Sequence, residues 1–224
     1  MSRSDQRLII FDFDGVVADS EILANRLGAE GLTALGLATT TEDHLRRYMG
    51  RSWAEYFEMV ARDLGRPLPE GYAAARRAEL DAAEHTVAAI EGVHGFVERF
   101  ISVPRCVASS NDLAYLHRTL ARLGMAEAFG GNVFSAQQVK RGKPAPDLFL
   151  HAAAALGAAP ERTLVIEDSP AGVQAGVAAG MTVLGLCAGG HCLPDHADRL
   201  RAAGAHLAAG SYAEAIGLTD MWLS

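Results

Sequence analysis

The chain has little of what marks a secreted or membrane-bound protein. Its 224 residues include only three cysteines, an odd number without regular spacing, which favours a reducing compartment over a disulfide framework. No segment has the length of an apolar membrane span, and the apolar run at residues 8–11 is too short for a signal peptide. We therefore expect a soluble cytoplasmic protein without a membrane partner.

Basic residues are also scarce. Lysine and arginine number 20 against 27 acidic residues, which gives a formal net charge of -7, and no basic run occurs. This balance argues against nucleic acid as the main partner. Half of the residues are hydrophobic and 21% are charged, as in ordinary globular proteins. The length suffices for one sizeable domain or for a core with an insertion.

The most informative segment is a short apolar run that ends in paired acids. Leu8-Ile9-Ile10-Phe11 predicts a buried strand, and Asp12-Phe13-Asp14-Gly15 follows it directly. Side chains alternate along a strand, so Asp12 and Asp14 start out aimed the same way, and their like charges favour a bound divalent cation such as Mg²⁺. One acid suits a nucleophile and the other a general acid and base. The alternative is a solvated Asp-Gly turn.

A helical pattern follows, and it gives way to alternating strands and helices after Gly92. Apolar residues at helical spacing predict helices over 24–35 and over 53–64, the second preceded by the capping box Ser52-x-x-Glu55. A third helix is predicted from Leu80, Ala83, Val87 and Ile90, ending before Gly92.

The alternating part favours a parallel sheet with crossover helices. Strands are predicted at 105–109, 132–135, 163–166 and 182–186, with a last strand–helix unit at about 205–216. The predicted fold class is therefore α/β. A Rossmann-like parallel-sheet core (residues 1–15 and 92–224) is interrupted by an all-helical insertion at residues 16–91.

Four groups of polar residues fall where the strands of the predicted core end. They are Asp12 with Asp14, Ser109-Ser110-Asn111, Lys143, and Glu167 with Asp168. Ligands of open parallel sheets bind at the carboxyl ends of the strands. Taken singly, Lys143 fits an exposed loop and the Glu167–Asp168 pair fits a helix N-terminus. Taken together, the groups predict a site that handles a phosphoryl group with Mg²⁺.

At this point the chain resembles the haloacid dehalogenase superfamily of phosphohydrolases, in the branch with a small helical cap. That branch includes β-phosphoglucomutase and many sugar-phosphate phosphatases. The matching motifs, in order, are Asp12-Phe13-Asp14-Gly15-Val16-Val17, Val107-Ala108-Ser109-Ser110, Gly142-Lys143-Pro144-Ala145-Pro146-Asp147 and Ile166-Glu167-Asp168-Ser169-Pro170-Ala171-Gly172. Their order and spacing match across nearly the whole chain.

The resemblance implies roles for the acidic residues. Asp12 would attack phosphorus and carry a transient aspartyl phosphate. Asp14 would protonate the leaving oxygen and later deprotonate the attacking water. Mg²⁺ would be held by the side chains of Asp12 and Asp168 and by the backbone carbonyl of Asp14, and Glu167 would support the ion from its outer layer.

The resemblance also implies how the phosphoryl group is held. Ser109 would contact its oxygens together with backbone donors of Ser110 and Asn111, and Gly15 would belong to the same substrate-binding loop. Lys143 would offset the charge that Asp12 shares with the phosphate. Because charge spreads over three oxygens in a loose transition state, positioning and electrostatics carry most of the catalysis.

Two departures narrow the implied reaction. Dehalogenases of the superfamily lack an acid at the position of Asp14. Phosphomutases of this branch carry a histidine where this chain has Ala24. These features favour a phosphatase, with a phosphomutase as the first alternative and a non-catalytic module that binds phosphorylated metabolites as the second.

The helical cap is expected to set the substrate. Glu21 is a candidate to accept hydroxyls of a sugar and Arg51 to pair with a second anionic group, although each also fits a solvated surface residue. A small sugar or sugar-acid phosphate is the expected substrate, and a monomer is the expected state.

One cluster of soft ligands remains outside these motifs. Cys187, His191, Cys192 and His196 lie close together in sequence and suggest zinc. The expected burial of Cys187 and the tight Gly189-Gly190 turn favour instead a loop beside the active site.

Overall fold

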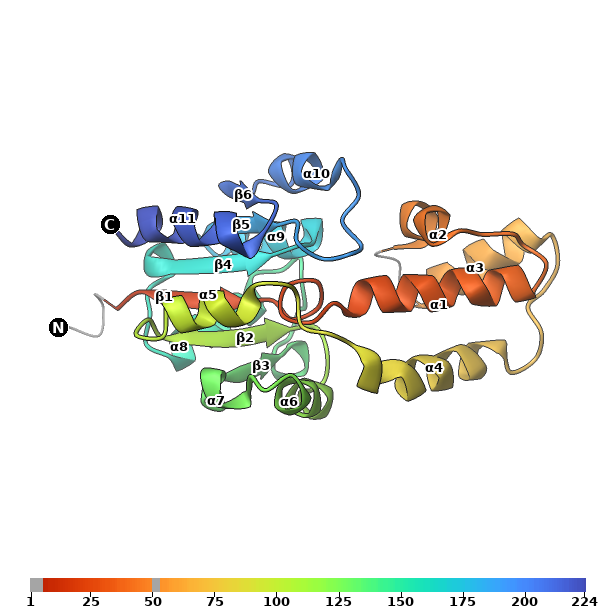
Figure 1. Cartoon of the computed structure of the whole chain (residues 1–224), viewed down its shortest axis with the longest axis horizontal. Helices are drawn as coiled ribbons and strands as arrows, with labels where there is room; N and C mark the ends of the chain where they lie inside the picture. Colours follow the sequence, from red (N-terminus) through yellow and green to blue (C-terminus); the bar gives the residue numbers. More distant parts are fainter. Residues whose placement is uncertain (1–5, 50–52) are drawn as a thin grey trace. The chain divides into compact units, whose positions relative to one another are not determined.

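The computed structural model describes residues 6–49 and 53–224, and the chain forms two compact units (Figure 1). One unit comprises the chain up to Asp19 together with Ala88–Ser224, and the other is Ser20–Val87. We call them the core unit and the helical unit and describe each by itself.

The core unit is built on a six-stranded sheet in which every neighbouring pair is parallel. The strands are β1 (Leu8–Phe11), β2 (Arg105–Ser109), β3 (Val133–Ser135), β4 (Thr163–Glu167), β5 (Thr182–Leu186) and β6 (Leu207–Ala209), in the spatial order β3-β2-β1-β4-β5-β6. The predicted α/β class is confirmed. The predicted spans of β2 and β5 coincide with those observed.

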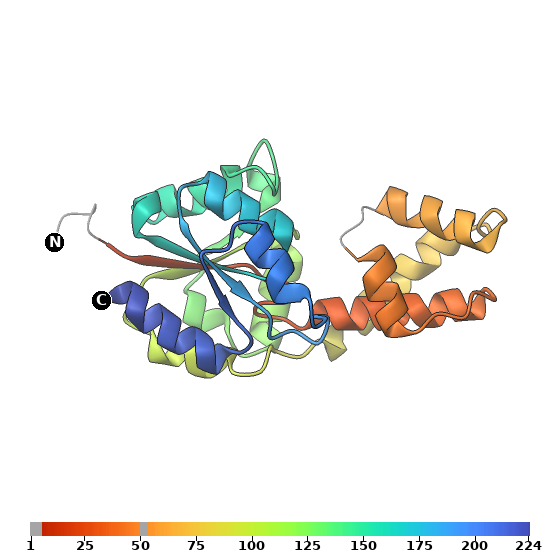
Figure 2. The ribbon, with the colours of Figure 1, turned by 90° about the horizontal axis from the view of Figure 1, so that it is seen from above.

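Helices cover both faces of this sheet, as Figure 2 shows for α9 on one side and α11 on the other. The helices are α5 (Val93–Arg99), α6 (Leu113–Arg122), α7 (Ala126–Phe129), α8 (Asp147–Ala155), α9 (Pro170–Ala178), α10 (His196–Ala202) and α11 (Tyr212–Leu223), with the short 3-10 helices η3 (Ala136–Gln138) and η4 (Pro160–Arg162). Alternate residues of β1 serve the two faces. Ile10 packs in the cluster that contains Phe149, whereas the ring of Phe11 contacts Phe96 and Phe129 edge-on.

Burial on both faces explains why continuous apolar runs form these strands. All four residues of β1 and all five of β4 are buried, and Ile10 pairs with Cys106 on one side and Val165 on the other. Strand β1 is thus held in the middle of the sheet. Because the strands are parallel, their carboxyl ends meet at one edge, where Asp12 and Glu167 lie.

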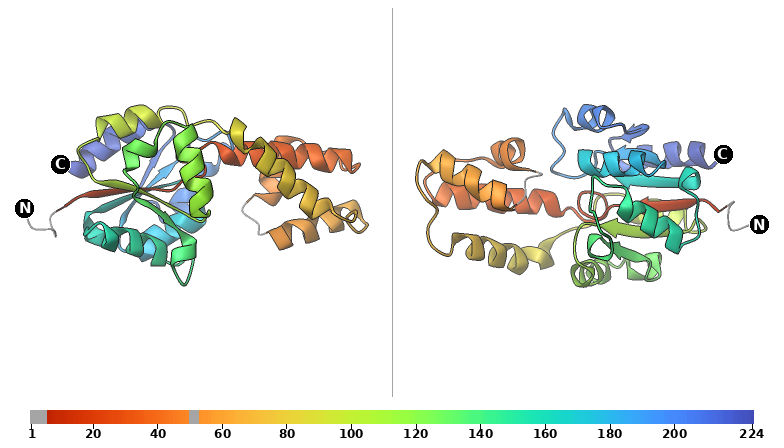
Figure 3. Two further views of the ribbon diagram at one scale, coloured as in Figure 1. Left: turned by 90° about the horizontal axis from the view of Figure 1, so that it is seen from below. Right: turned by 180° about the vertical axis from the view of Figure 1, so that it is seen from behind.

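The helical unit contains α1 (Ser20–Ala34), α2 (Thr41–Tyr48), α3 (Trp53–Leu64), α4 (Tyr72–Ala83) and the 3-10 helix η2 (Glu84–Thr86) (Figure 3). Its own apolar cluster joins Leu32 of α1, Tyr48 of α2, and Tyr56 and Val60 of α3. The expected capping residue Ser52 lies outside the described residues.

Two expectations for this part of the chain were wrong. The pattern did not predict α2, because its cap uses Asp43 rather than the usual Glu or Gln to bond back to Thr40. The third helix was predicted to run to residue 90 but α4 ends at Ala83. Val87 and Ile90 are both buried outside this helix, Val87 as the last residue of the helical unit and Ile90 within the core unit.

The units divide at Asp19 and Ala88, so residues 16–19 and 88–91 fold with the core and not with the insertion. Ile90 N donates to Val17 O at 2.9 Å, and Ala18 forms a bridge with Ala89. Val16, Val17 and Ala18 are fully buried. The two connecting segments are therefore tied to each other within the core unit.

Within residues 6–49 and 53–224, no helix combines the length and the apolar character that a membrane crossing needs.

Candidate active site

Strand β1 delivers Asp12 to the carboxyl edge of the sheet, and a tight loop carries Asp14 beside it. Asp12 N donates to Ile166 O of the neighbouring strand at 2.9 Å. Phe13 O then accepts from the backbone N–H groups of Val17 and Ala18 at 2.8 and 2.9 Å. These bonds fix the loop in which both acids stand.

Lys143 joins two of the predicted acidic residues. Its Nζ donates to Asp12 Oδ1 at 2.5 Å and to Glu167 Oε1 at 2.7 Å, and it lies 4.8 Å from the ring centroid of Phe149. Burial alone would lower the pKa of Lys143, but the two carboxylates outweigh it and raise the pKa above its usual value. Lys143 thus stays a cation.

The expected position of Lys143 at a strand end was wrong. It comes from the loop between η3 and α8, several residues beyond the end of β3. A lysine that reaches the edge from a loop leaves no strand pattern in the sequence. Its motif, rather than its place in an element, identified it.

Glu167 is fully buried and held at both oxygens. Its Oε2 accepts from Ser169 N at 2.7 Å and from Ser169 Oγ at 2.9 Å, while Oε1 faces Lys143. Gly172 leaves the space that this carboxylate fills, because a Cβ there would lie 1.5 Å from Oε1. Close packing against Glu167 thus explains the glycine that ends the motif at residues 166–172.

Acidic oxygens gather at this edge in a way that suits a hard cation. Ligand atoms of Asp12, Glu167 and Asp168 lie within 4.8 Å of one another, and all three residues are buried. Burial raises the pKa of Asp12 well above its usual value, and the carboxylates of Glu167 and Asp168 add to this while Lys143 opposes it. Three buried carboxylates against one ammonium leave negative charge that Mg²⁺ would neutralise. The donor set therefore fits Mg²⁺.

Asn111 has a contact that the sequence analysis did not foresee. Its side-chain Nδ2 donates to Asp14 Oδ2 at 2.6 Å. The backbone of Asn111 is fixed in turn, because its N–H donates to Ser109 Oγ at 3.1 Å and its carbonyl accepts from Ser135 Oγ at 2.6 Å. Residues at the ends of β2 and β3 thus fix the backbone of Asn111, and the side-chain amide of Asn111 orients Asp14.

The other residues predicted to hold phosphate also stand at this edge. Ser109 is the buried last residue of β2, and Ser110 is exposed just beyond it. Gly15 has φ of 73°, in the left-handed region, and a Cβ there would lie 1.9 Å from Asp168 Oδ2. Only glycine fits where the Asp14 loop passes this close to Asp168.

Two histidines grip Asp168, and their role was not predicted. His191 Nε2 lies 2.9 Å from Asp168 Oδ2, and His196 Nε2 donates to Asp168 O at 2.6 Å. Both rings are buried and meet edge-on. The sequence grouped them with cysteines as soft metal ligands, but the packing that places them against Asp168 is visible only in three dimensions.

The soft-ligand cluster is compact as well. Ligand atoms of His191, Cys192 and His196 lie within 4.8 Å of one another. Burial raises the pKa of the Cys192 thiol to about 12, with Asp168 adding to the effect. His196 already uses Nε2 to hold a backbone carbonyl. Hydrogen bonding to Asp168 accounts for the two histidines, in agreement with a loop beside the active site.

Neither of the two predicted cap contacts belongs to the described part of the core unit. Glu21 lies in the first turn of α1, in the helical unit, where Asn25 Nδ2 donates to its backbone carbonyl at 2.8 Å. Arg51 lies outside the described residues.

Known proteins are similar to this chain in sequence and in fold. The family model for haloacid dehalogenase-like hydrolases matches residues 9–186. The 6-phosphogluconate phosphatase of Escherichia coli (strain K12) is 31% identical over 188 residues, which cover 83% of this chain and 85% of that protein.

Two solved structures extend the comparison to the fold. A conserved haloacid dehalogenase-like protein of unknown function from Agrobacterium tumefaciens is 33% identical with a TM-score of 0.91, covering 98% of this chain and 100% of that one. A hydrolase of the same family from Deinococcus radiodurans R1, solved with bound phosphate and sodium, is 32% identical with a TM-score of 0.88, covering 98% and 97%. The resemblance predicted from the motifs is confirmed. Because the family model spans most of the sequence and each of these relatives covers at least 83% of it, the chain belongs to the haloacid dehalogenase-like hydrolase family and is an enzyme.

Proposed function

We propose that this enzyme is a Mg²⁺-dependent phosphatase that hydrolyses a small phosphorylated metabolite through an aspartyl-phosphate intermediate. The observation that carries the proposal is the buried acidic cluster of Asp12, Glu167 and Asp168, joined to Lys143 at the carboxyl edge of the sheet. A protein that only binds phosphate has no use for a buried nucleophile with a second acid beside it.

The first chemical step belongs to Asp12. Its Oδ would form a bond to phosphorus while the bond from phosphorus to the leaving oxygen breaks, and Asp14 would supply the proton that this oxygen takes up. In the second step Asp14 would take a proton from water as the water attacks phosphorus and releases Asp12. The hydrogen bond from Asn111 holds Asp14 in position for both transfers.

The rest of the site would manage charge. Ser109 and the backbone N–H groups beyond it would hold the phosphoryl oxygens, and Lys143 would offset the charge of Asp12 and the phosphate. Asp12, Asp168 and the carbonyl of Asp14 would hold Mg²⁺, with Glu167 supporting it. When bound, the ion supplies positive charge that stabilises the transition state.

A sugar or sugar-acid phosphate is the substrate class that the relatives support, since one of them is a 6-phosphogluconate phosphatase. Hydrolysis is favoured over mutase chemistry because Ala24 occupies the position at which phosphomutases of this branch carry a histidine. The three cysteines, an odd number without regular spacing, support a reducing compartment such as the cytoplasm as the location. We take the enzyme to act as a monomer.

The test is phosphate release from a panel of sugar, sugar-acid, nucleotide and aryl phosphates. We expect release with Mg²⁺, none with EDTA, and a loss of at least about 1,000-fold in Asp12→Asn, because the covalent route then lacks its nucleophile. Asp198→Asn is the matched control, since that side chain is 83% exposed in the core unit. Folded wild-type protein that releases phosphate from none of these compounds would contradict the proposal.

A further inference from the structure

The soft-ligand cluster of His191, Cys192 and His196 lies in the core unit, in the loop between β5 and at the start of α10. Ligand atoms of the three residues lie within 4.8 Å of one another. Two turns hold the loop in shape, because Cys192 N donates to Gly189 O at 3.0 Å and His196 N donates to Leu193 O at 2.8 Å. Both histidines are buried and Cys192 is partly exposed, so an ion from solvent can reach the cluster at the sulfur.

The distance between Cys192 and His191 fits two ligands of one zinc ion. Cys192 Sγ lies 3.5 Å from His191 Nε2. Bond lengths of about 2.3 Å to sulfur and about 2.0 Å to nitrogen, at a tetrahedral angle of about 109°, separate two such ligand atoms by about 3.6 Å. Sulfur and imidazole nitrogen suit Zn²⁺, whereas Mg²⁺ prefers oxygen. The pair therefore offers a soft site next to the hard acidic one.

His196 is prepared as a third ligand. Its Nε2 donates to Asp168 O at 2.6 Å, and a carbonyl oxygen only accepts, so in the neutral ring the proton is on Nε2 and Nδ1 carries a lone pair. Among the described residues, Nδ1 of this buried ring has no hydrogen-bond partner. Histidines that bind a metal through one nitrogen typically donate the other N–H to a carbonyl or carboxylate. A metal ion would satisfy the nitrogen that the fold leaves unpaired.

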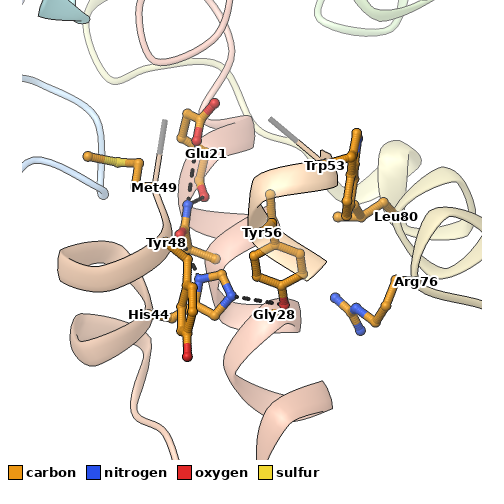
Figure 4. Close-up of a pocket in the computed structure, with 11 residues that line it drawn as sticks. Glu21, Gly28, His44, Tyr48, Met49, Trp53, Tyr56, Arg76 and Leu80 are labelled. Atoms are coloured by element: carbon orange, nitrogen blue, oxygen red, sulfur yellow. Dashed lines mark hydrogen bonds between the residues drawn. The ribbon is translucent and has the colours of Figure 1, made fainter. Parts of the chain in front are cut away.

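The buried histidine of the helical unit lacks these features. His44 is bonded at both ring nitrogens, through Nδ1 to Asn25 Oδ1 at 2.8 Å and through Nε2 to Tyr56 OH at 3.3 Å, as the dashed lines in Figure 4 show. Among the described residues that line the pocket around it there is no cysteine. Hydrogen bonding therefore accounts fully for His44, whereas His196 has an unused nitrogen close to a thiol.

From these contacts we propose that His191, Cys192 and His196 bind Zn²⁺, and that the bound ion inhibits the enzyme. The thiol of Cys192 gives its proton to solvent as the bond between sulfur and zinc forms, because the thiolate is the ligand. Without zinc, the two histidines are held by the contacts with Asp168 described above. Zinc is a second partner for the same rings.

The inhibition follows from the place of Asp168 between the two sites. His191 Nε2 lies 2.9 Å from Asp168 Oδ2, so zinc bound at this nitrogen replaces their contact and has the carboxylate beside it as a fourth ligand. Asp168 is then drawn away from Asp12 and Glu167, with which it forms the acidic cluster. Two ions that need one carboxylate weaken each other's binding by the same factor. The inhibition rests on the proposed Mg²⁺-dependent phosphatase function, and the zinc site does not.

The first experiment detects the site without turnover. Metal-free, full-length protein is titrated with Co²⁺, a spectroscopic substitute for Zn²⁺ that shows a charge-transfer band in the near ultraviolet only when a thiolate binds it. We expect this band in the wild type, its loss on addition of Zn²⁺, and its weakening when Mg²⁺ is added at limiting Co²⁺. Cys192→Ser should lack the band.

Cys187→Ser is the matched control, because Cys187 is also partly exposed but does not belong to the cluster, and it should keep the band. A wild type without the band, or a band that persists in folded Cys192→Ser, would overturn the zinc site. A band that Mg²⁺ leaves unchanged would overturn the competition for Asp168.

The second experiment measures inhibition of aryl phosphate hydrolysis by Zn²⁺ at a fixed Mg²⁺ concentration, with each protein compared with its own zinc-free rate. We expect the half-inhibitory concentration of Zn²⁺ to rise at least about 10-fold in Cys192→Ser and to stay unchanged in Cys187→Ser, since loss of a metal ligand weakens the site by at least this factor. Equal inhibition of all three proteins would place the inhibiting ion in the acidic cluster and overturn inhibition through the loop. If no protein cleaves the aryl phosphate, the phosphatase proposal and the inhibition fail together, whereas the Co²⁺ titration still decides on the zinc site.

Discussion

At the scale of single residues, Asp168 has two contacts with histidines that its sequence motif does not predict. Its carboxylate faces His191 and its carbonyl accepts from His196. Hydrogen bonds to a carboxylate that binds a metal fix its orientation, and their removal typically weakens the metal site. Gly15 and Gly189 both leave space for the His191 ring, since a Cβ at either position would lie within 2.7 Å of it. The loop is built around this contact.

Replacing His191 is therefore expected to weaken Mg²⁺ binding. His191→Gln should raise the dissociation constant for Mg²⁺ about 10-fold, because Asp168 loses the partner that orients it. The measurement is calorimetric titration of Mg²⁺ into metal-free protein, which does not depend on turnover. His117→Gln replaces an exposed histidine of α6 and serves as the control. Identical Mg²⁺ affinities in all three proteins would show that His191 does not position Asp168.

At the scale of elements, the packing of α1 against α2 depends on a missing side chain. Gly28 faces His44 across this contact, while the ring of His44 bonds to Asn25 on the same helix. A glycine inside a helix normally lowers stability by about 0.5–1 kcal/mol relative to alanine. At Gly28 the missing Cβ leaves the space that the buried ring of His44 fills. We therefore expect alanine to lower stability at this position rather than raise it.

Gly28→Ala should therefore destabilise the helical unit. We expect a loss of about 1–3 kcal/mol, as for overpacking in a core, despite the better helix propensity of alanine. Gly217→Ala is the matched control in α11, where nothing lies within 4 Å of the new Cβ, and it should be neutral or stabilising. The readout is urea denaturation. A Gly28→Ala protein as stable as the Gly217→Ala protein would contradict the packing described here.

The same histidine gives the helical unit a pH dependence with a definite sign. Burial and the nearby Arg76 lower the pKa of His44 from 6.5 to about 4. Between pH 4 and pH 6.5, His44 therefore binds a proton more readily in the unfolded chain than in the folded one. The contribution to stability is complete above pH 6.5 and is lost as the pH falls toward 4, amounting to at most about 3 kcal/mol.

This dependence can be followed with one fluorophore. The chain has two tryptophans, and Trp53 lies in α3 whereas Trp222 lies in α11. In a Trp222→Phe background, Trp53 reports on the helical unit alone. We expect the melting temperature of the helical unit to fall as the pH is lowered from 7 to 5. In His44→Gln the melting temperature should depend less steeply on pH. An equally steep slope in His44→Gln would assign the effect to other groups.

At the scale of the whole molecule, how far the sequence predicts the structure follows from burial. Strands buried on both faces appear as apolar runs, so β2 and β5 were predicted to the residue. Helix α10 was not predicted, because the sequence analysis assigned His196 to a loop beside the active site. The acidic residues of the site and Lys143 were predicted from the motifs, because a motif depends only on the order and spacing of residues along the chain.

Other parts of the site depend on contacts between distant segments. The bond from Asn111 to Asp14 spans 97 residues, and the grip of His191 on Asp168 links a loop to a strand end. In the helical unit, Gly28 leaves the space that the ring of His44 fills. No local pattern records any of these. They follow from the packing and were accessible only once the fold was known.

The central claim is that Asp12 carries the phosphoryl group during turnover. The most direct test mixes enzyme, Mg²⁺ and 6-phosphogluconate, quenches the mixture with acid within one turnover, and maps the peptides by mass spectrometry. We expect one added phosphoryl group on the peptide that contains Asp12, and none when EDTA is present or when Asp12→Asn is used. Phosphate release by the wild type without that modified peptide, or with the modification on another residue, would contradict the mechanism.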